Sequence, residues 1–82
     1  QYSQRVPTRK VNEVVRAAQQ AQPGPHGVRI LYATQGATDP PTFTLFANKD
    51  VPPHYLRYIE RMLREAFGLE RVPVKLRVRK RS

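Results

Sequence analysis

The chain has 82 residues, with 15 lysines and arginines against 6 aspartates and glutamates, and a formal net charge of +9 at pH 7. This length allows one small domain with a thin core of two layers. The absence of cysteine excludes disulfides, thiolate metal sites and a thiol nucleophile, and fits a reducing compartment. Because so large a positive surplus repels itself, it favours an anionic partner: nucleic acid first, then an anionic membrane surface or an acidic protein face.

Prolines and glycines divide the chain into stretches with distinct hydrophobic periods. Residues 8–22 carry an apolar stripe at helical spacing and predict a helix, with Thr8 as its N-cap. Residues 28–34 and 42–48 alternate and predict two strands. The QGATDPP connection between them is too long for a two-residue turn, so we expect an antiparallel hairpin with a wide loop.

Residues 54–67 predict a second helix, with Pro52 and Pro53 in its first turn and Gly68 as a left-handed C-cap. Its predicted apolar stripe consists of Tyr55, Leu56, Ile59, Leu63, Ala66 and Phe67. Residues 74–79 alternate strictly and predict a third strand, after which we expect the basic end to fray. The order is α-β-β-α-β. The fold class is therefore α+β, with two helices packed on one face of a three-stranded sheet.

Reactive side chains are too few for a catalytic or metal site. The serines are Ser3 and Ser82, one near each end of the chain, and His26 and His54 have no partner at metal-ligand spacing. The carboxylates are scattered, and two on the second helix have an arginine at i,i+4 spacing, which predicts an ion-paired exposed face. We therefore expect no catalysis, no metal and no cofactor in this chain.

A GxxG sequence occurs at residues 24–27. In KH domains such a loop clamps a nucleic-acid backbone between two helices. Here it runs from a predicted helix into a predicted strand, and Pro25 removes one of its amides. We interpret it as a helix-to-strand turn.

Alternation along the three strands defines two faces of the sheet. The face expected beneath the helices carries Val28, Ile30, Tyr32, Phe43, Leu45, Val74, Leu76 and Val78. The other face carries Arg29, Leu31, Ala33, Thr44, Phe46, Lys75, Arg77 and Arg79. Apolar side chains among cations suit base stacking with phosphate contacts, or docking on another protein surface, although isolated exposed apolar residues are also common.

Two sets of candidate binding residues follow, from this second face and from the basic residues at the edge and ends of the sheet. The candidate RNA-binding cations are Arg5, Arg9, Lys10, Arg29, Lys75, Arg77, Arg79, Lys80 and Arg81. The candidate docking residues are Leu31, Thr44 and Phe46. Cations gain on phosphates by releasing counterions, without any reading of the bases.

Several blocks of this sequence, in order and at matching spacing between about Val6 and Lys80, resemble one known family. They are Tyr32-Ala33-Thr34-Gln35, Pro40-Pro41-Thr42-Phe43, Phe46-Ala47-Asn48, Tyr55-Leu56-Arg57-Tyr58, Leu63-Arg64-Glu65-Ala66-Phe67-Gly68 and Pro73-Val74. The family is the C-terminal KH-like domain of the tandem-GTPase ribosome-assembly factors called Der or EngA.

The resemblance implies a KH-like domain over residues 6–80, with residues 1–5 as a linker from an upstream domain and residues 81–82 as a basic tail. It implies a longer parent whose upstream domains bind GTP and Mg²⁺ and carry out hydrolysis. The implied partners are the GTPase domains of the same polypeptide, large-subunit ribosomal RNA and the ribosome. It implies a cytoplasmic protein without membrane contact, and we expect the isolated domain to be monomeric. A docking module without RNA contact and a free-standing KH-like ribosome-binding protein are the alternatives.

Overall fold

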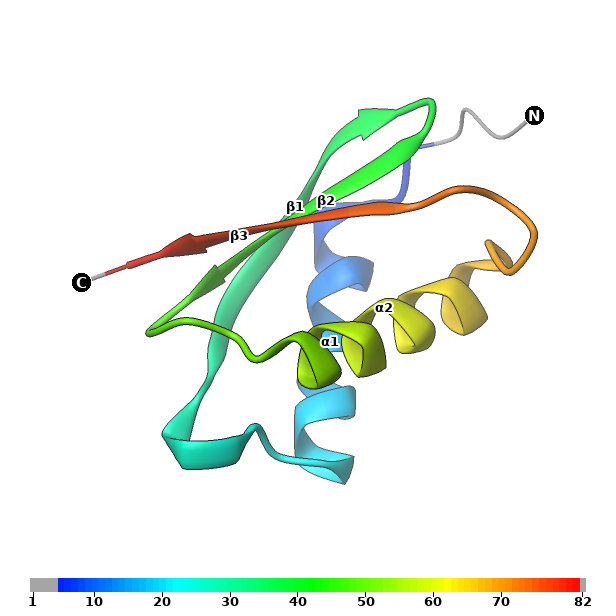
Figure 1. The fold of residues 1–82 in the computed structure, drawn as a ribbon. Coiled ribbons are helices and arrows are strands. Elements are labelled where there is room, and N and C mark those ends of the chain that lie inside the picture. Colours follow the sequence, from blue (N-terminus) through cyan, green and yellow to red (C-terminus); the bar gives the residue numbers. More distant parts are fainter. Residues whose placement is uncertain (1–4, 82) are drawn as a thin grey trace.

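A computed structural model describes residues 5–81 of the chain (Figure 1). Its elements are α1 (Thr8–Ala21), a short 3₁₀ turn (Pro25–Gly27), β1 (Ile30–Thr38), β2 (Pro41–Ala47), α2 (Pro53–Phe67) and β3 (Lys75–Lys80). The predicted α-β-β-α-β order and the α+β class are confirmed. Residues 1–4 of the expected linker, including Ser3, and residue Ser82 of the expected tail lie outside the described residues.

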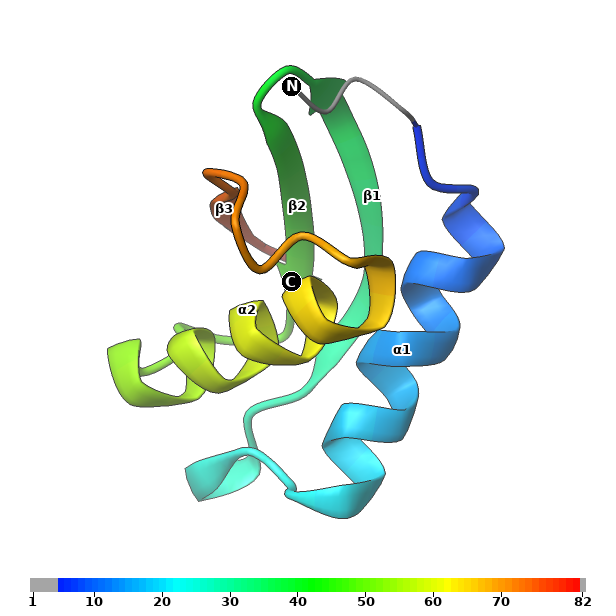
Figure 2. The ribbon, with the colours of Figure 1, turned by 90° about the vertical axis from the view of Figure 1, so that its right-hand side faces the viewer.

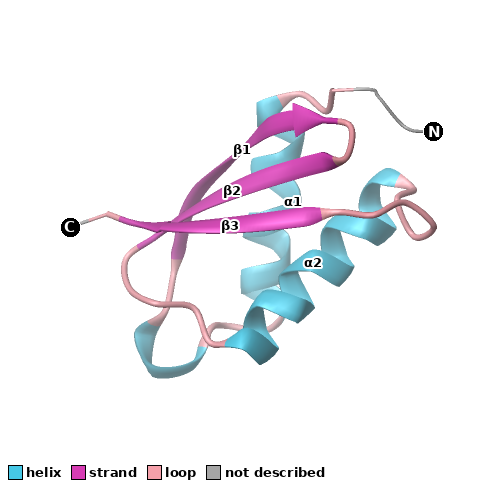
Figure 3. Ribbon diagram, turned by 45° about the horizontal axis from the view of Figure 1, so that its top comes forward, coloured by secondary structure: helices cyan, strands magenta, loops and turns pink. Residues whose placement is uncertain are grey.

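The three strands form one mixed sheet in the order β1-β2-β3. β1 and β2 pair antiparallel, as expected for a hairpin, and β3 pairs parallel to β2. Parallel pairing requires a crossover between the two strands, which α2 supplies. In Figure 3 α1 passes behind the strands and α2 lies below β3, and Figure 2 shows α1 alongside β1. Residues of both helices pack in one core cluster with strand residues. One face of the sheet is therefore left open, and we call it the outer face.

The core lies between the sheet and the two helices. The α1 stripe buries Val11, Val15 and Ala18, which belong to the same cluster as strand and α2 residues such as Phe43 and Ile59. The packing of both helices on one face is thus confirmed.

Tyr58 is a buried member of the α2 face that the stripe prediction left out. Its ring is buried, and its hydroxyl donates a hydrogen bond to the carbonyl of Ala18 at 2.7 Å. A tyrosine can be buried in this way because its one polar group has a partner.

The prediction of a wide hairpin loop is wrong. β1 continues to Thr38, which pairs with Pro41, so only Asp39 and Pro40 form the turn. The peptide bond between these two residues is cis. Most of the QGATDPP segment instead lengthens the hairpin beyond both predicted strands.

Of the helix caps predicted from the sequence, the N-cap of α1 is wrong and the C-cap of α2 is confirmed. Thr8 is not the N-cap: α1 begins at Thr8, and the preceding Pro7 carbonyl accepts hydrogen bonds from the amides of Lys10 and Val11 at 3.0 and 3.1 Å. Gly68 ends α2 at φ 68° and ψ 33°, which confirms the left-handed C-cap. The interpretation of residues 24–27 as a helix-to-strand turn is also confirmed.

The expectation that the basic end frays is wrong for Lys80 and Arg81. Lys80 is the last residue of β3 and pairs with Ala47. The Arg81 amide then donates to the Ala47 carbonyl at 2.8 Å. Backbone pairing therefore holds this end of the chain on β2.

Candidate nucleic-acid interface

A β-bulge in β1 determines which side chains reach the outer face. Ile30 pairs with Ala47 and Tyr32 pairs with Phe46, so Leu31 is an extra residue in the ladder. An extra residue reverses the alternation that follows it.

The predicted orientations of Tyr32 and Ala33 are therefore both wrong. Ala33 is completely buried, although it was expected on the outer face, and Tyr32 is 37% exposed, although it was expected beneath the helices. The available signal was the run of four apolar residues from Ile30 to Ala33, which breaks strict alternation.

The displaced tyrosine forms an aromatic stack with the neighbouring strand. The rings of Tyr32 and Phe46 are 4.5 Å apart between centroids and inclined by 17°. The Arg81 guanidinium carbon lies 5.5 Å from the Tyr32 ring centroid, and its Nη1 donates to the Tyr32 hydroxyl at 2.5 Å. These contacts hold a partly exposed aromatic surface in one orientation.

A row of cations lies beside this stack. Lys75, Arg77, Arg79 and Arg81 occupy alternate positions along β3 and its extension, and all four are exposed. Arg79 is in register with Phe46 on β2. Within residues 5–81, none of the four takes part in an ion pair. Their positive charge is therefore available to an anionic partner.

A shallow cavity of about 240 Å³ opens on the same face. It is lined by Gly36, Ala37, Thr42, Thr44, Arg77 and Arg79. Two guanidinium groups and the Thr44 hydroxyl are donors that suit phosphate oxygens, whereas the Thr42 hydroxyl donates to the Pro40 carbonyl at 3.1 Å.

The other predicted cations have different surroundings. Arg5 donates a hydrogen bond to the Gln35 carbonyl, and Arg9 pairs with Glu13 at 3.3 Å. Lys10 is exposed next to Arg9 at the start of α1.

Lys80 does not share the orientation of the row on β3. It forms an ion pair with Asp50 at 3.6 Å, although both side chains are well exposed. Of the nine candidate cations, the structure thus gathers Lys75, Arg77, Arg79 and Arg81.

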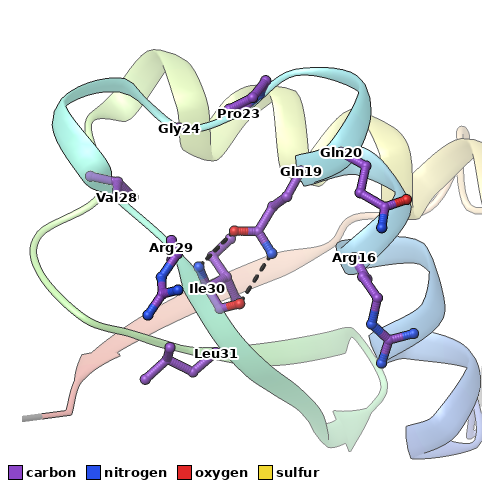
Figure 4. A pocket seen from close by; sticks show the side chains of 9 residues that line it. All are labelled: Arg16, Gln19, Gln20, Pro23, Gly24, Val28, Arg29, Ile30 and Leu31. Carbon is purple, nitrogen blue, oxygen red and sulfur yellow. Dashed lines mark hydrogen bonds between the residues drawn. The ribbon is translucent and has the colours of Figure 1, made fainter.

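Arg29 and Leu31 border a second cavity, of about 420 Å³, between α1 and the start of β1 (Figure 4). Leu31 is 47% exposed, and Arg16 and Gln20 approach the cavity from α1. Sequence reasoning missed Arg16, because a single cation on the exposed side of a helix carries no signal of what lies opposite.

Two side-chain amides of α1 cover the free edge of β1. Gln19 accepts from the Ile30 amide at 2.7 Å and donates to the Ile30 carbonyl at 3.1 Å, as the dashed lines in Figure 4 show. Two helical turns earlier, Asn12 does the same for Ala33 at 2.8 and 2.9 Å. The two amides replace a neighbouring strand and protect an edge that would otherwise be open to pairing.

The ion-paired face predicted for α2 is half present. Glu60 and Arg64 pair at 3.0 Å. Arg61 instead places its guanidinium 5.6 Å from the ring centroid of Tyr58.

Tyr55 in the core has a perturbed pKa. Its buried hydroxyl donates to the Gln22 carbonyl at 2.7 Å. Burial, and to a lesser degree the neighbouring Tyr58, raise the pKa of this phenol above its ordinary value of 10.0.

Residues 5–81 contain no group of three or more histidine, aspartate or glutamate side chains that could hold a metal ion. Over the same range, no helix is long and apolar enough to cross a membrane.

A three-stranded mixed sheet with two helices on one face defines an α+β domain and is consistent with the KH-like class. Residues 5–79 match the family model described as the KH-domain-like C-terminal domain of EngA bacterial GTPase enzymes. The chain belongs to this family, which confirms the resemblance noted in the sequence.

Individual relatives agree. The chain is 44% identical over 81 residues to GTPase Der of Bifidobacterium longum, covering 94% of this chain and 18% of that protein. It is 46% identical over 72 residues to GTPase Der of Mycobacterium avium, covering 88% and 16%. With GTPase Der of Desulforamulus reducens it shares 40% identity over 86 residues, covering 98% and 20%. The chain therefore spans about a fifth of the length of these curated relatives.

Proposed function

We propose that this chain is the RNA-contacting accessory domain of a Der-type GTPase. In this proposal it acts in the cytoplasm, at the C-terminal end of a polypeptide whose other domains bind GTP and Mg²⁺. It contacts large-subunit ribosomal RNA during ribosome assembly and docks on the GTPase domains of its own polypeptide. Family membership supports the setting, because the relatives are named GTPases and are about five times longer than the aligned region.

The row of four cations without ion-pair partners is the observation that carries the RNA contact. Lys75, Arg77, Arg79 and Arg81 face the same way from one strand, next to a cavity lined by two of them. Each cation that neutralises a phosphate releases counterions, which favours binding without any base-specific contact. An ordinary exposed strand would have little reason to collect four like charges, since they repel each other.

Docking in cis is proposed for the surface around Leu31. The other two predicted docking residues, Thr44 and Phe46, lie on the outer face in register with Arg77 and Arg79 and belong to the proposed RNA contact. Leu31 is one of two large apolar side chains exposed among the described residues, and Arg29 beside it provides charge for an acidic partner surface. An apolar contact rimmed by a cation fits a surface of a GTPase domain that carries carboxylates.

The RNA contact is tested by the salt dependence of binding. We compare the double variant R77A/R79A with R57A/R61A, which removes the same charge from exposed positions of α2 on the other side of the sheet. With a large-subunit rRNA fragment, R77A/R79A should lower the slope of log K against log salt by about 1.5, because each phosphate contact contributes about 0.7–0.9. The α2 variant should keep the wild-type slope. Equal slopes for wild type and R77A/R79A would rule out this RNA surface.

The docking surface is tested separately. L31D should weaken binding to separately supplied GTPase domains at least tenfold, whereas H54D adds the same charge at an exposed position of α2 and should not. Undiminished binding of L31D would exclude the surface around Leu31. Loss of GTPase-domain binding in R77A/R79A, in a protein that binds no RNA, would favour the alternative of a docking module without RNA contact.

A further inference from the structure

The aromatic stack of the outer face has no role in holding phosphate, although it lies among the phosphate-binding candidates. Tyr32 and Phe46 come from the edge and the centre of the sheet, and Arg79 continues the same cross-strand row on β3. The two rings stack face to face, so a planar base can lengthen this stack at its Tyr32 end, at the edge of the sheet.

Packing of the core does not account for the exposed tyrosine. Tyr32 is 37% exposed, and the bulge at Leu31 is what brings it to the open face. Its hydroxyl interacts with Arg81, whose side chain is itself exposed and exchangeable. The ring is therefore held upright at the surface and accessible to solvent.

Groups that can donate hydrogen bonds to phosphate oxygens lie next to the two rings on the same face of the sheet. Thr44 and Arg77 form the next cross-strand row, and both line the cavity of about 240 Å³ together with Arg79. Alternate residues on a strand are about 6.6 Å apart, so the cations of β3 form a line along which an extended backbone can run.

We propose that the outer face is a binding site for single-stranded RNA, in which an unpaired base stacks on Tyr32 and so lengthens the Tyr32–Phe46 stack. The neighbouring phosphates bind Arg77, Arg79 and Arg81, and Arg81 exchanges the Tyr32 hydroxyl for a phosphate oxygen. This inference rests on the proposed RNA contact and adds the kind of RNA and the residues that distinguish it.

The geometry favours unpaired RNA over a duplex. In a duplex the bases are stacked on each other and paired, so only the phosphates would reach this face and the rings would contribute nothing. A protein partner would have to bury four cations and match each with a carboxylate, because an unpaired buried charge is costly. Single-stranded RNA supplies both the negative charge that the four cations need and the accessible planar bases that the rings need.

The test compares two RNA probes and three variants. Fluorescence anisotropy of the 82-residue chain is measured with an eight-nucleotide oligouridine and with an RNA hairpin duplex, at several salt concentrations. Y32A should weaken oligouridine binding by about 5- to 150-fold, the equivalent of about 1–3 kcal/mol per stacked base. Its salt slope should equal that of wild type, and its affinity for the duplex should change less than twofold.

Y32F keeps the ring and removes only the hydroxyl, so it should bind oligouridine within about threefold of wild type. R77A should weaken both probes and lower both salt slopes by about 0.7–0.9. Thermal unfolding serves as the folding control, and Y32A should remain folded because its side chain lies at the surface of an edge strand.

The outcomes separate the two proposals. If R77A weakens oligouridine binding but Y32A does not, stacking on Tyr32 is overturned while the RNA contact stands. If wild type binds neither probe, both are overturned. If Y32A weakens the duplex as much as the single strand, the site does not select unpaired RNA and the inference is wrong.

Discussion

Replacing Asn12 by alanine should destabilise the domain far more than its position on a surface helix suggests. The Asn12 side-chain amide accepts from the Ala33 amide at 2.8 Å and donates to the Ala33 carbonyl at 2.9 Å. Ala33 is completely buried. N12A therefore leaves one donor and one acceptor of the backbone without their partner in a site with little access to water.

The magnitude follows from these two groups. A buried hydrogen-bonding group left unsatisfied costs about 1–3 kcal/mol. The better helix propensity of alanine returns about 0.5 kcal/mol. With about 1–2 kcal/mol for each of the two groups, less this gain, we expect N12A to lower the free energy of unfolding by about 1.5–3.5 kcal/mol, which corresponds to about 6–28 °C in melting temperature for a domain of this size.

The assay is urea unfolding followed by circular dichroism, with amide exchange at Ala33 as a local readout. The matched control is Q20A, which removes an exposed amide from the same helix and should change stability by less than about 0.5 kcal/mol. N12D keeps the acceptor but loses the donor, so its stability should lie between those of N12A and wild type. If N12A and Q20A lowered the free energy of unfolding equally, the role of Asn12 in covering the free edge of β1 would be refuted.

Two further predictions concern the tyrosine cluster and the end of α2. Because the pKa of Tyr55 is raised in the folded state, its protonated form contributes stability that is complete below pH 10 and is lost as pH rises through the folded-state pKa. Urea unfolding between pH 7 and 11 should show Y55F less stable than wild type by about 1 kcal/mol at neutral pH, because the hydrogen bond to Gln22 is lost. This difference in the free energy of unfolding should shrink above pH 10. A difference that stays constant with pH would contradict this prediction. G68A should cost about 1 kcal/mol in the same assay because φ is 68°, whereas G68N should cost less; equal losses in both would indicate that the left-handed backbone is not the cause.

Sequence periodicity was sufficient for the order of elements and for most of the core. The stripes of Val11, Val15 and Ala18 in α1 and of Ile59 and Leu63 in α2 pack where their spacing predicts. These patterns are local, because each depends only on the pitch of its own helix. The strict alternation of β3 was equally informative: Lys75, Arg77 and Arg79 lie on the predicted face. The resemblance to the EngA and Der family was also readable from short blocks, since their order and spacing do not depend on how the chain folds.

Tertiary structure alone decided which residues meet. The bulge at Leu31 depends on how β1 pairs with β2, and one extra residue moves Tyr32 to the outer face and Ala33 into the core. The edge contacts of Asn12 and Gln19 depend on the placement of a helix against a strand, and they join residues that are 21 and 11 positions apart in the sequence. The hydrophobic periodicity of one segment cannot predict strand register or a long-range contact, because both depend on pairing between segments that are distant in the sequence.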